Sequence, residues 1–267
     1  MRNRSLPAYG AVAGDIVGSR FERRPTKSRE FELDHPECRY TDDTILTVAT
    51  AAAILEAGGS DAEAAYSEAY KRFGRDDPDR GYGGNFRKWL RTDSLEPYGS
   101  FGNGSAMRVA PVGCVFDTRE QVLQEAKRSA SATHDHPEGI RGAQAVAYTI
   151  WLCRTEPEIM PGEIEAEITT RFSYRLDESL DAIRPRYRFD VTCQGSVPQA
   201  IVAFLEATSV EDAIRNAISL GGDSDTQACM AGAMAAARFA EISEEIMTLV
   251  RNHLPARYLE ILDALDE

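Results

Sequence analysis

The chain has 267 residues, of which 43% are apolar and 27% are charged, and its formal net charge is −13. This length and composition are typical of a folded globular protein with a large buried core. The acidic balance argues against a surface that wraps nucleic acid, because such a surface needs an excess of Lys and Arg. No apolar run approaches the roughly 20 residues that span a bilayer, so we expect no contact with a membrane.

Cysteine usage and the first residues indicate the compartment. The five cysteines, at positions 38, 114, 153, 193 and 229, are scattered and form no Cys-x-x-Cys pair. This pattern predicts reduced thiols rather than a disulfide framework or a zinc knuckle. The basic start has no apolar stretch behind it, so it does not resemble a signal peptide. We therefore expect a cytoplasmic protein, and we expect it to be a monomer.

Helical periodicity and capping residues recur along the whole chain. Residues 8–18 predict a tightly packed helix whose glycines let another backbone come close. Residues 187–191 alternate like a strand but have no partner strand, so we predict an extended loop. The other predicted helices are 45–57, a helix opened by a capping box at 60–63 and ending near 73, 85–90, 106–110 with a restart at Pro111, a helix capped by Thr118 and Gln121 and ending near 131, 139–152, 161–172, 176–184, 196–207, 209–220, 227–240, 244–250 and 254–265.

No linker, repeat or low-complexity run divides this succession of helices. The sequence therefore predicts an all-α fold in which residues 1–267 form a single compact multi-helix domain.

The most informative stretch is residues 221–226, Gly-Gly-Asp-Ser-Asp-Thr, which follows an apolar run and opens the helix at 227–240. Two glycines permit a sharp turn, and acceptors from Asp223, Asp225 and Thr226 then crowd the first helical turn. The positive end of the helix dipole favours carboxylates there. Because Asp and Ser are also ordinary N-cap residues, this stretch alone leaves a purely structural role open.

A second acidic helix start makes the first one more specific. Thr41, Asp42, Asp43 and Thr44 precede the helix at 45–57, so a Thr and two Asp again lie at a helix N-terminus. Two such sets, one in each half of the chain, would make an oxygen-only site for two hard divalent cations. The sequence therefore predicts a metal centre built at helix N-termini.

Residues 99–105, Gly-Ser-Phe-Gly-Asn-Gly-Ser, form the loop richest in glycine. Small residues of this kind can leave backbone N–H groups open to phosphate oxygens, although a flexible turn is the simpler interpretation. His134 and His136 could suggest zinc, but a single pair without further ligands is more typical of loop histidines. Glu22 lies in a polar loop, where it could equally be a solvated charge.

Together these motifs resemble the ADP-ribosylglycohydrolase family, which includes the dinitrogenase-reductase-activating glycohydrolase and the ADP-ribosyl-acceptor hydrolases. The matching residues occur in the family's order between residue 8 and about residue 240. They are Gly14, Asp15, Gly18 and Glu22; Thr41, Asp42, Asp43 and Thr44; Arg80, Gly81, Tyr82 and Gly83; Gly102, Asn103, Gly104, Ala106, Met107 and Arg108; Thr133 and His134; and Gly222, Asp223, Asp225 and Thr226.

The resemblance implies a fold, a reaction and a set of site residues. The fold is a compact all-α one with a binuclear magnesium or manganese centre. The reaction is hydrolysis of the bond between C1 of the distal ribose of ADP-ribose and an acceptor, which would be a protein side chain or a small conjugate. The implied metal ligands are Thr41, Asp42, Asp43, Asp223, Asp225 and Thr226; the implied general base is Glu22; the implied substrate contacts are Gly99, Ser100, Phe101, Gly102, Asn103, Gly104 and His134, with Phe101 stacked on adenine.

Two other classes of function remain open at this stage. The first is an all-α metal-dependent nucleotide pyrophosphatase, although no Glu-x-x-Glu helix face stands beside the predicted site. The second is a protein that binds ADP-ribose without catalysis, or an acidic immunity factor. The loss of a metal ligand would favour this second class, but all six are present.

Overall fold

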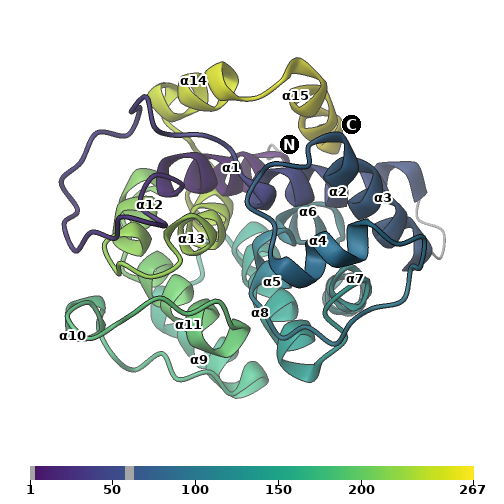
Figure 1. The fold of residues 1–267 in the computed structure, drawn as a ribbon. Coiled ribbons are helices and arrows are strands. Elements are labelled where there is room, and N and C mark those ends of the chain that lie inside the picture. Colours follow the sequence, from purple (N-terminus) through teal and green to yellow (C-terminus); the bar gives the residue numbers. More distant parts are fainter. Residues whose placement is uncertain (1–3, 58–62) are drawn as a thin grey trace.

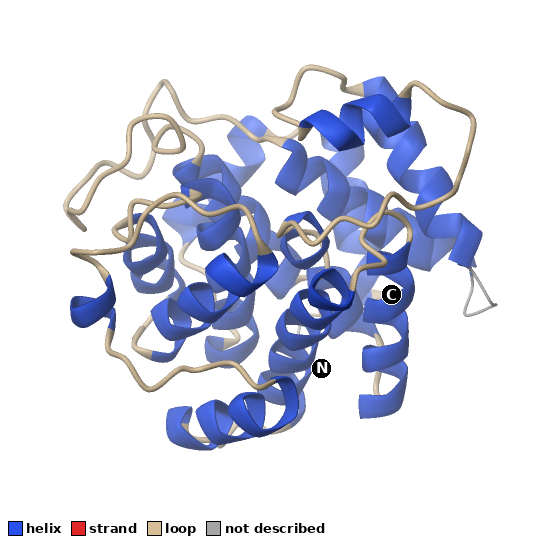
Figure 2. Cartoon of the chain, turned by 60° about the horizontal axis from the view of Figure 1, so that its bottom comes forward, coloured by secondary structure: helices blue, strands red, loops and turns tan. Residues whose placement is uncertain are grey.

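The structure, a computed structural model, describes residues 4–57 and 63–267. Within these two segments every regular element is a helix, and the only β-type pairing is an isolated bridge between Gly102 and Thr192. Figure 2 shows the helices joined by long loops. The prediction of an all-α fold is therefore confirmed.

The helices follow one another in the order given in Figure 1. Their bounds are α1 (Leu6–Gly18), α2 (Asp42–Ala57), α3 (Glu63–Asp76), α4 (Gly84–Leu90), α5 (Gly104–Met107), α6 (Ala110–Val115), α7 (Arg119–Ser131), α8 (Pro137–Thr155), α9 (Pro161–Phe172), α10 (Leu180–Ile183), α11 (Cys193–Leu205), α12 (Val210–Ile218), α13 (Ser224–Phe239), α14 (Glu244–His253), α15 (Ala256–Asp263) and a final 3-10 turn, η1 (Ala264–Asp266).

Helices α1 and α13, from opposite ends of the chain, pack against each other in the interior (Figure 1). Glycines make this close packing possible. A Cβ atom on Gly14 would lie 2.0 Å from the carbonyl oxygen of Ala228, and one on Gly10 would lie 2.4 Å from that of Gly232. Only glycine lets the two backbones come so close, as the sequence predicted for residues 8–18. This contact brings the end of α1 against the start of α13, where the second acidic stretch lies.

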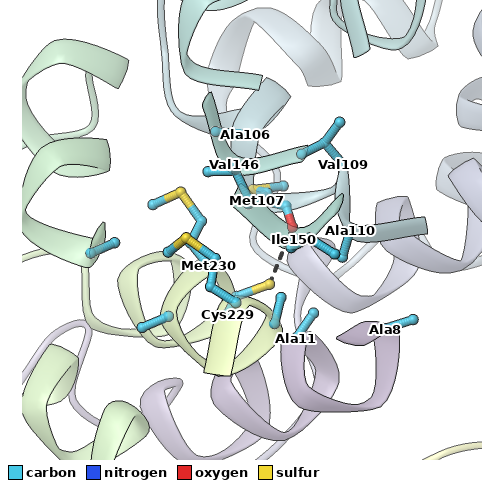
Figure 3. Close-up of a cluster of buried hydrophobic side chains, with 14 of the residues drawn as sticks. Ala8, Ala11, Ala106, Met107, Val109, Ala110, Val146, Ile150, Cys229 and Met230 are labelled. Carbon is cyan, nitrogen blue, oxygen red and sulfur yellow. Dashed lines mark hydrogen bonds between the residues drawn. The ribbon is translucent and has the colours of Figure 1, made fainter. Parts of the chain in front are cut away.

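Apolar side chains fill the space where α1, α5, α6, α8 and α13 meet (Figure 3). Ala11, Ala106 and Met230 are among the buried residues there, and the Cys229 thiol donates a hydrogen bond to the Met107 carbonyl oxygen at 3.2 Å. The buried apolar residues of the described chain form one cluster that extends from Ala8 to Leu265. Both halves of the chain therefore contribute to one core.

All five cysteines are free and buried, so the prediction of reduced thiols is confirmed. In the described segments, no helix combines the length and the apolar character that crossing a membrane requires.

Most local predictions agree with the structure. Thr118 and Gln121 form the expected capping box of α7. Helix α8 covers the predicted 139–152 and extends beyond it at both ends, from Pro137 to Thr155. Residues 187–191 form a loop, as predicted. The capping box at Ser60 lies outside the described residues.

The prediction for residues 176–184 was wrong over most of its length, because only α10 is helical there. The Ser179 side chain accepts a hydrogen bond from the Ala182 N–H, so the helix begins after Ser179 rather than before it. Tyr174 and Leu176 are buried although they lie in a segment without regular secondary structure. The apolar residues of this segment are therefore buried side chains of a loop and do not indicate a helix.

Candidate metal centre and substrate cavity

The starts of α2 and α13 and the loop before α5 surround one cavity of about 400 Å³. A larger and more open groove of about 830 Å³ lies between α7, α8 and α9 and contains none of the predicted site residues. The smaller cavity is lined by most of them, namely Glu22, Asp42, Asp43, Ser100, Gly102, Asn103, Gly104, His134, Asp223, Asp225 and Thr226. Thr41, Gly99 and Phe101 are not part of its lining.

The start of α2 is held by a residue of α1. Asp15 is completely buried, and its carboxylate accepts hydrogen bonds from the backbone N–H of Thr41 at 2.8 Å and from that of Thr44 at 3.1 Å. The hydroxyl groups of both threonines donate to it as well. Asp15 therefore caps α2 from a distant position in the sequence, satisfying N–H groups that a helix start leaves without partners. This fixes the direction of Asp42 and Asp43 in the first turn.

The two acidic helix starts meet at Asp43. The Thr226 hydroxyl, on α13, donates to Oδ2 of Asp43 at 3.3 Å. Carboxylate oxygens of Asp15, Asp43 and Asp225 lie within 4.8 Å of one another. Oδ1 of Asp43 is buried and has no hydrogen-bond partner. An anionic oxygen without a partner in such a place is costly, and a cation would compensate it.

Repulsion among these carboxylates shows in their proton affinities. Burial, and next the charge of Asp15, raises the pKa of Asp43 well above its ordinary value. Burial followed by the charge of Asp223 does the same to the pKa of Asp225. Burial raises the pKa of Asp223 to about 6, and the charge of Glu22 adds to this. A group of acids that resists ionisation in the absence of a counter-charge is suited to a hard cation, since all the available ligand atoms are oxygens.

Within the described residues, the aspartate trio is the only group of three or more His, Cys, Asp or Glu side chains close enough to share an ion. The two neighbouring histidines take separate roles. The exposed His136 accepts a hydrogen bond from the Glu138 N–H and so caps α8. His134 is buried at the cavity, where its Nδ1 lies 2.7 Å from the Thr133 hydroxyl. These different partners agree with the interpretation of the pair as loop histidines.

The glycine-rich loop is held more firmly than the sequence suggested. We expected its backbone N–H groups to be open, but several are used within the protein. The N–H of Gly99 donates to the Asp135 carboxylate at 2.8 Å, that of Gly102 to the Ser100 hydroxyl at 3.2 Å, and that of Asn103 to the Val191 carbonyl at 2.8 Å. These hydrogen bonds hold the loop against other segments of the chain, so that it forms one wall of the cavity. The N–H groups of Gly104 and Ser105 have no such partner in the described structure.

Phe101 lies outside the cavity, with 46% of its surface exposed. Its ring centroid is 5.3 Å from that of His136. It therefore fills no part of the core and presents an apolar face to solvent beside the cavity wall.

Sequence reasoning assigned no role to several residues of the site, among them Asp15, Tyr98 and Arg108. Asp15 belongs to the carboxylate cluster, and an acid in the middle of an apolar, glycine-rich helix was the signal for it. Tyr98 and Arg108 line the cavity, and Arg108 is completely buried. Arg108 belongs to a motif that carries the family resemblance, but the motif alone gave it no role, and no local pattern marks Tyr98.

The fold and the aspartate cluster together define an all-α protein with an oxygen-donor site at helix starts. The sequence model of the ADP-ribosylglycohydrolase family matches residues 7–266. The chain is 28% identical to ADP-ribosylhydrolase ARH3 of Mus musculus and 29% identical to that of Homo sapiens. These alignments cover 86% of this chain, and 82% and 83% of the mouse and human proteins.

A solved structure described as an ADP-ribosylglycohydrolase-related protein complex superposes with a TM-score of 0.70 at 22% identity, covering 99% of this chain and 96% of that one. At this level of identity the likeness shows the fold.

The chain belongs to the ADP-ribosylglycohydrolase family, and it is a hydrolase that acts on glycosidic bonds of ADP-ribose.

Proposed function

We propose that the protein uses two divalent cations, Mg²⁺ or Mn²⁺, to hydrolyse the bond between C1 of the distal ribose of ADP-ribose and an acceptor, which is a protein side chain or a small conjugate. The observation that carries this proposal is the buried, unpartnered Oδ1 of Asp43 inside a cluster of carboxylates whose pKa values are raised. Such a cluster is compensated by cations and not by hydrogen bonds alone.

The proposed metal ligands are Thr41, Asp42, Asp43, Asp223, Asp225 and Thr226. Their atoms are all oxygens, as Mg²⁺ and Mn²⁺ prefer. Asp15 contributes indirectly, because hydrogen bonds from Thr41 and Thr44 occupy its carboxylate. When bound, such ions orient the hydroxyl groups of a ribose and lower the pKa of a bound water towards neutrality.

Glu22 is the proposed general base. It lies in the cavity lining, half-buried, in the loop that follows α1. A carboxylate at this place can take a proton from the attacking water or stabilise the positive charge that develops on the sugar in the transition state. Its charge also raises the pKa of Asp223, so the two carboxylates face the same space.

The proposed substrate contacts are Gly99, Ser100, Phe101, Gly102, Asn103, Gly104 and His134. Because four of these form one preorganised wall of the cavity, a diphosphate could bind there without ordering a loop. Exposed Phe101 would then stack on the adenine at the edge of the cavity. We further propose that residues 1–267 act as one domain, as a monomer, in the cytoplasm.

A nucleotide pyrophosphatase and a non-catalytic ADP-ribose binder are the alternatives that experiment must exclude. Mono-ADP-ribosylated arginine, serine, acetyl-ester and nucleobase acceptors are incubated with the protein in Mg²⁺, in Mn²⁺ and in excess chelator, and the products are identified by mass spectrometry. We expect free ADP-ribose and unmodified acceptor only where metal is present. AMP appearing before any ADP-ribose would indicate a pyrophosphatase, and binding without turnover of any acceptor would indicate a binding protein.

Glu22→Gln sharpens this test. We expect turnover to fall by about 10²–10⁴, the usual contribution of general acid–base catalysis, with little change in ADP-ribose affinity. Glu30→Gln, an exposed carboxylate of the same loop, is the matched control and should leave both quantities unchanged.

A further inference from the structure

We propose that Arg108, acting through Thr133, fixes His134 in the tautomer that carries its proton on Nε2, so that the ring presents an N–H donor to an acceptor oxygen of the bound ligand. The inference rests on the proposed function for the identity of that ligand, ADP-ribose. Arg108 and Thr133 are positioning residues in this arrangement, because they act through His134.

Arg108 is clamped in a buried position between α7 and the cavity. Its Nη2 donates to the Ser129 carbonyl oxygen and to the Thr133 hydroxyl oxygen, each at 2.9 Å. The guanidinium carbon lies 3.9 Å from the centroid of the Tyr70 ring, so an aromatic face covers the cation. The Tyr70 hydroxyl is in turn hydrogen-bonded to the Ser129 hydroxyl at 2.7 Å. These contacts fix the direction of Nη2 towards Thr133.

The Thr133 hydroxyl determines which tautomer the His134 ring adopts. A guanidinium can only donate, so the Thr133 oxygen accepts from Arg108 and keeps its own proton free. Nδ1 of His134 lies 2.7 Å from that oxygen. The adjacent positive charge polarises the hydroxyl, which makes its proton the stronger donor and its oxygen the weaker acceptor. The Tyr98 hydroxyl also interacts with Thr133. Because a neutral imidazole nitrogen is a stronger acceptor than a phenol oxygen, the Thr133 proton points to Nδ1, which acts as the acceptor.

His134 has only one ring proton to place. Burial, and next the charge of Arg108, lowers the pKa of His134 well below its ordinary value, so the ring is neutral near pH 7. With Nδ1 accepting from Thr133, the ring proton lies on Nε2.

Nε2 faces the glycine-rich wall of the cavity. A Cβ atom on Gly104 would lie 3.2 Å from Nε2 of His134, and one on Gly102 would lie 3.6 Å from it. A side chain at position 104 would therefore crowd Nε2, whereas a Cβ atom at position 102 would make only an ordinary contact, so the glycine at 104 helps to keep the donor accessible from the cavity. A ligand oxygen held against this wall, from a diphosphate or a ribose hydroxyl, would accept the hydrogen bond.

The test reads the tautomer directly in the protein without metal or substrate. Protein with ¹⁵N-labelled histidine is studied in excess chelator at pH 7.5 by long-range ¹H–¹⁵N correlation, and the His134 signals are assigned by their loss in His134→Asn. We expect an unprotonated Nδ1 and a protonated Nε2. In Thr133→Val, which keeps the shape but removes the hydroxyl, the two nitrogen shifts should move towards each other as both tautomers become populated.

Three further variants define the result. Thr133→Ser keeps the hydroxyl and should restore the wild-type pattern. Thr149→Val makes the same change at a buried threonine that bonds only its own helix, and should have no effect. Arg108→Met should mix the tautomers as Thr133→Val does. Should Arg108→Met fail to fold by circular dichroism, the Val and Ser variants at position 133 decide the question.

Calorimetry then connects the tautomer to the ligand. We expect Thr133→Val to weaken ADP-ribose binding about tenfold, or about 1.4 kcal/mol, the order of one hydrogen bond, and Thr133→Ser to stay within about twofold of the wild type. A wild-type ring protonated on Nδ1, or a pattern unchanged in Thr133→Val, would overturn the relay. A changed tautomer with unchanged ADP-ribose affinity would overturn the role of Nε2 in binding. Failure of hydrolysis alone would count against the proposed function and leave the tautomer result standing.

Discussion

The side-chain amide of Asn103 donates a hydrogen bond to Oδ2 of Asp223 at 2.7 Å, and this bond connects the glycine-rich wall to the carboxylate cluster. Both residues are buried. The bond lowers the pKa of Asp223, against the larger effect of burial, which raises it. Asn103 therefore keeps Asp223 closer to the ionised form, which its proposed role as a metal ligand requires, while the backbone N–H of Asn103 holds the wall to Val191.

Asn103→Ala removes this donor and should weaken Mg²⁺ binding by about tenfold, because a hydrogen bond to a charged group is worth about 1.5–3 kcal/mol and part of it is regained from water. Calorimetric titration of the metal-free protein with Mg²⁺ measures the change. Gln144→Ala is the matched control, because that amide donates to the Leu123 carbonyl away from the cavity. Equal Mg²⁺ affinity in the Asn103 variant and the wild type would contradict the link.

Phe101→Ala should weaken ADP-ribose binding by roughly 10- to 100-fold, since stacking of a base on an aromatic ring is worth about 1–3 kcal/mol. The folded state should lose little stability, because the ring is 46% exposed and fills no core. Calorimetry with ADP-ribose checks the affinity, and thermal melting checks the fold. Met160→Ala, at another exposed apolar side chain outside the cavity, is the control. An unchanged dissociation constant would remove Phe101 from the adenine site.

The sequence was sufficient to predict the two acidic helix starts, because a turn followed by clustered acceptors and a helical run is a local pattern. It was also sufficient to predict the close packing around Gly14, since glycines spaced four apart share one face of a helix. The sequence indicated that Asp43 meets Thr226 only because the chain contains two similar acidic helix starts. The structure brings these two side chains into contact.

The remaining features depend on contacts between distant segments. Asp15 caps α2 only because α1 passes beside its start, and no spacing within the sequence encodes this. The N–H groups of the glycine-rich loop are used by Asp135 and Val191, which come from elsewhere in the chain, so composition alone suggested an open loop. Arg108 similarly meets Thr133 through tertiary packing.

The pH dependence of metal stabilisation follows from the raised carboxyl pKa values. The pKa of Asp223 is about 6 in the folded protein, against an ordinary value of 3.8. The metal-free native state therefore binds this proton more tightly than the unfolded chain does. Tighter proton binding adds to the free energy of unfolding, and this contribution is fully present below pH 3.8 and is lost as the pH rises through about 6. The pKa values of Asp42, Asp43 and Asp225 are raised in the same direction.

In the proposed metal centre a divalent cation would replace these protons, so Mg²⁺ should raise the melting temperature more at pH 7.5 than at pH 5. At 100 times its dissociation constant the ion adds about 2.7 kcal/mol, or about 5–10 °C for a protein of this size. Melting curves in Mg²⁺ and in chelator at both pH values give the two differences. Asp43→Asn and Asp225→Asn should each lose most of the Mg²⁺-dependent gain and most activity while keeping the helical fold. An equal gain at both pH values would contradict the proton–metal exchange.

Gly14→Ala tests whether the crossing of α1 and α13 positions the proposed metal centre. The new methyl group would lie 2.0 Å from the Ala228 carbonyl oxygen, so the two backbones must separate. We expect a loss of about 1–3 kcal/mol in the free energy of unfolding, as is usual when a packed interface is overfilled. Because Asp15 is the next residue after Gly14 in α1 and Asp225 lies at the start of α13, the same separation should also weaken Mg²⁺ binding. Gly162→Ala is the matched control, because a Cβ atom there meets nothing within 4 Å. This change in helix α9 should leave Mg²⁺ affinity unchanged and stabilise the protein by up to about 1 kcal/mol.

Urea unfolding measures the stability of both variants, and titration with Mg²⁺ measures their affinity for the ion. A Gly14→Ala protein that loses stability but keeps wild-type Mg²⁺ affinity would show that the crossing supports the fold without setting the geometry of the carboxylates.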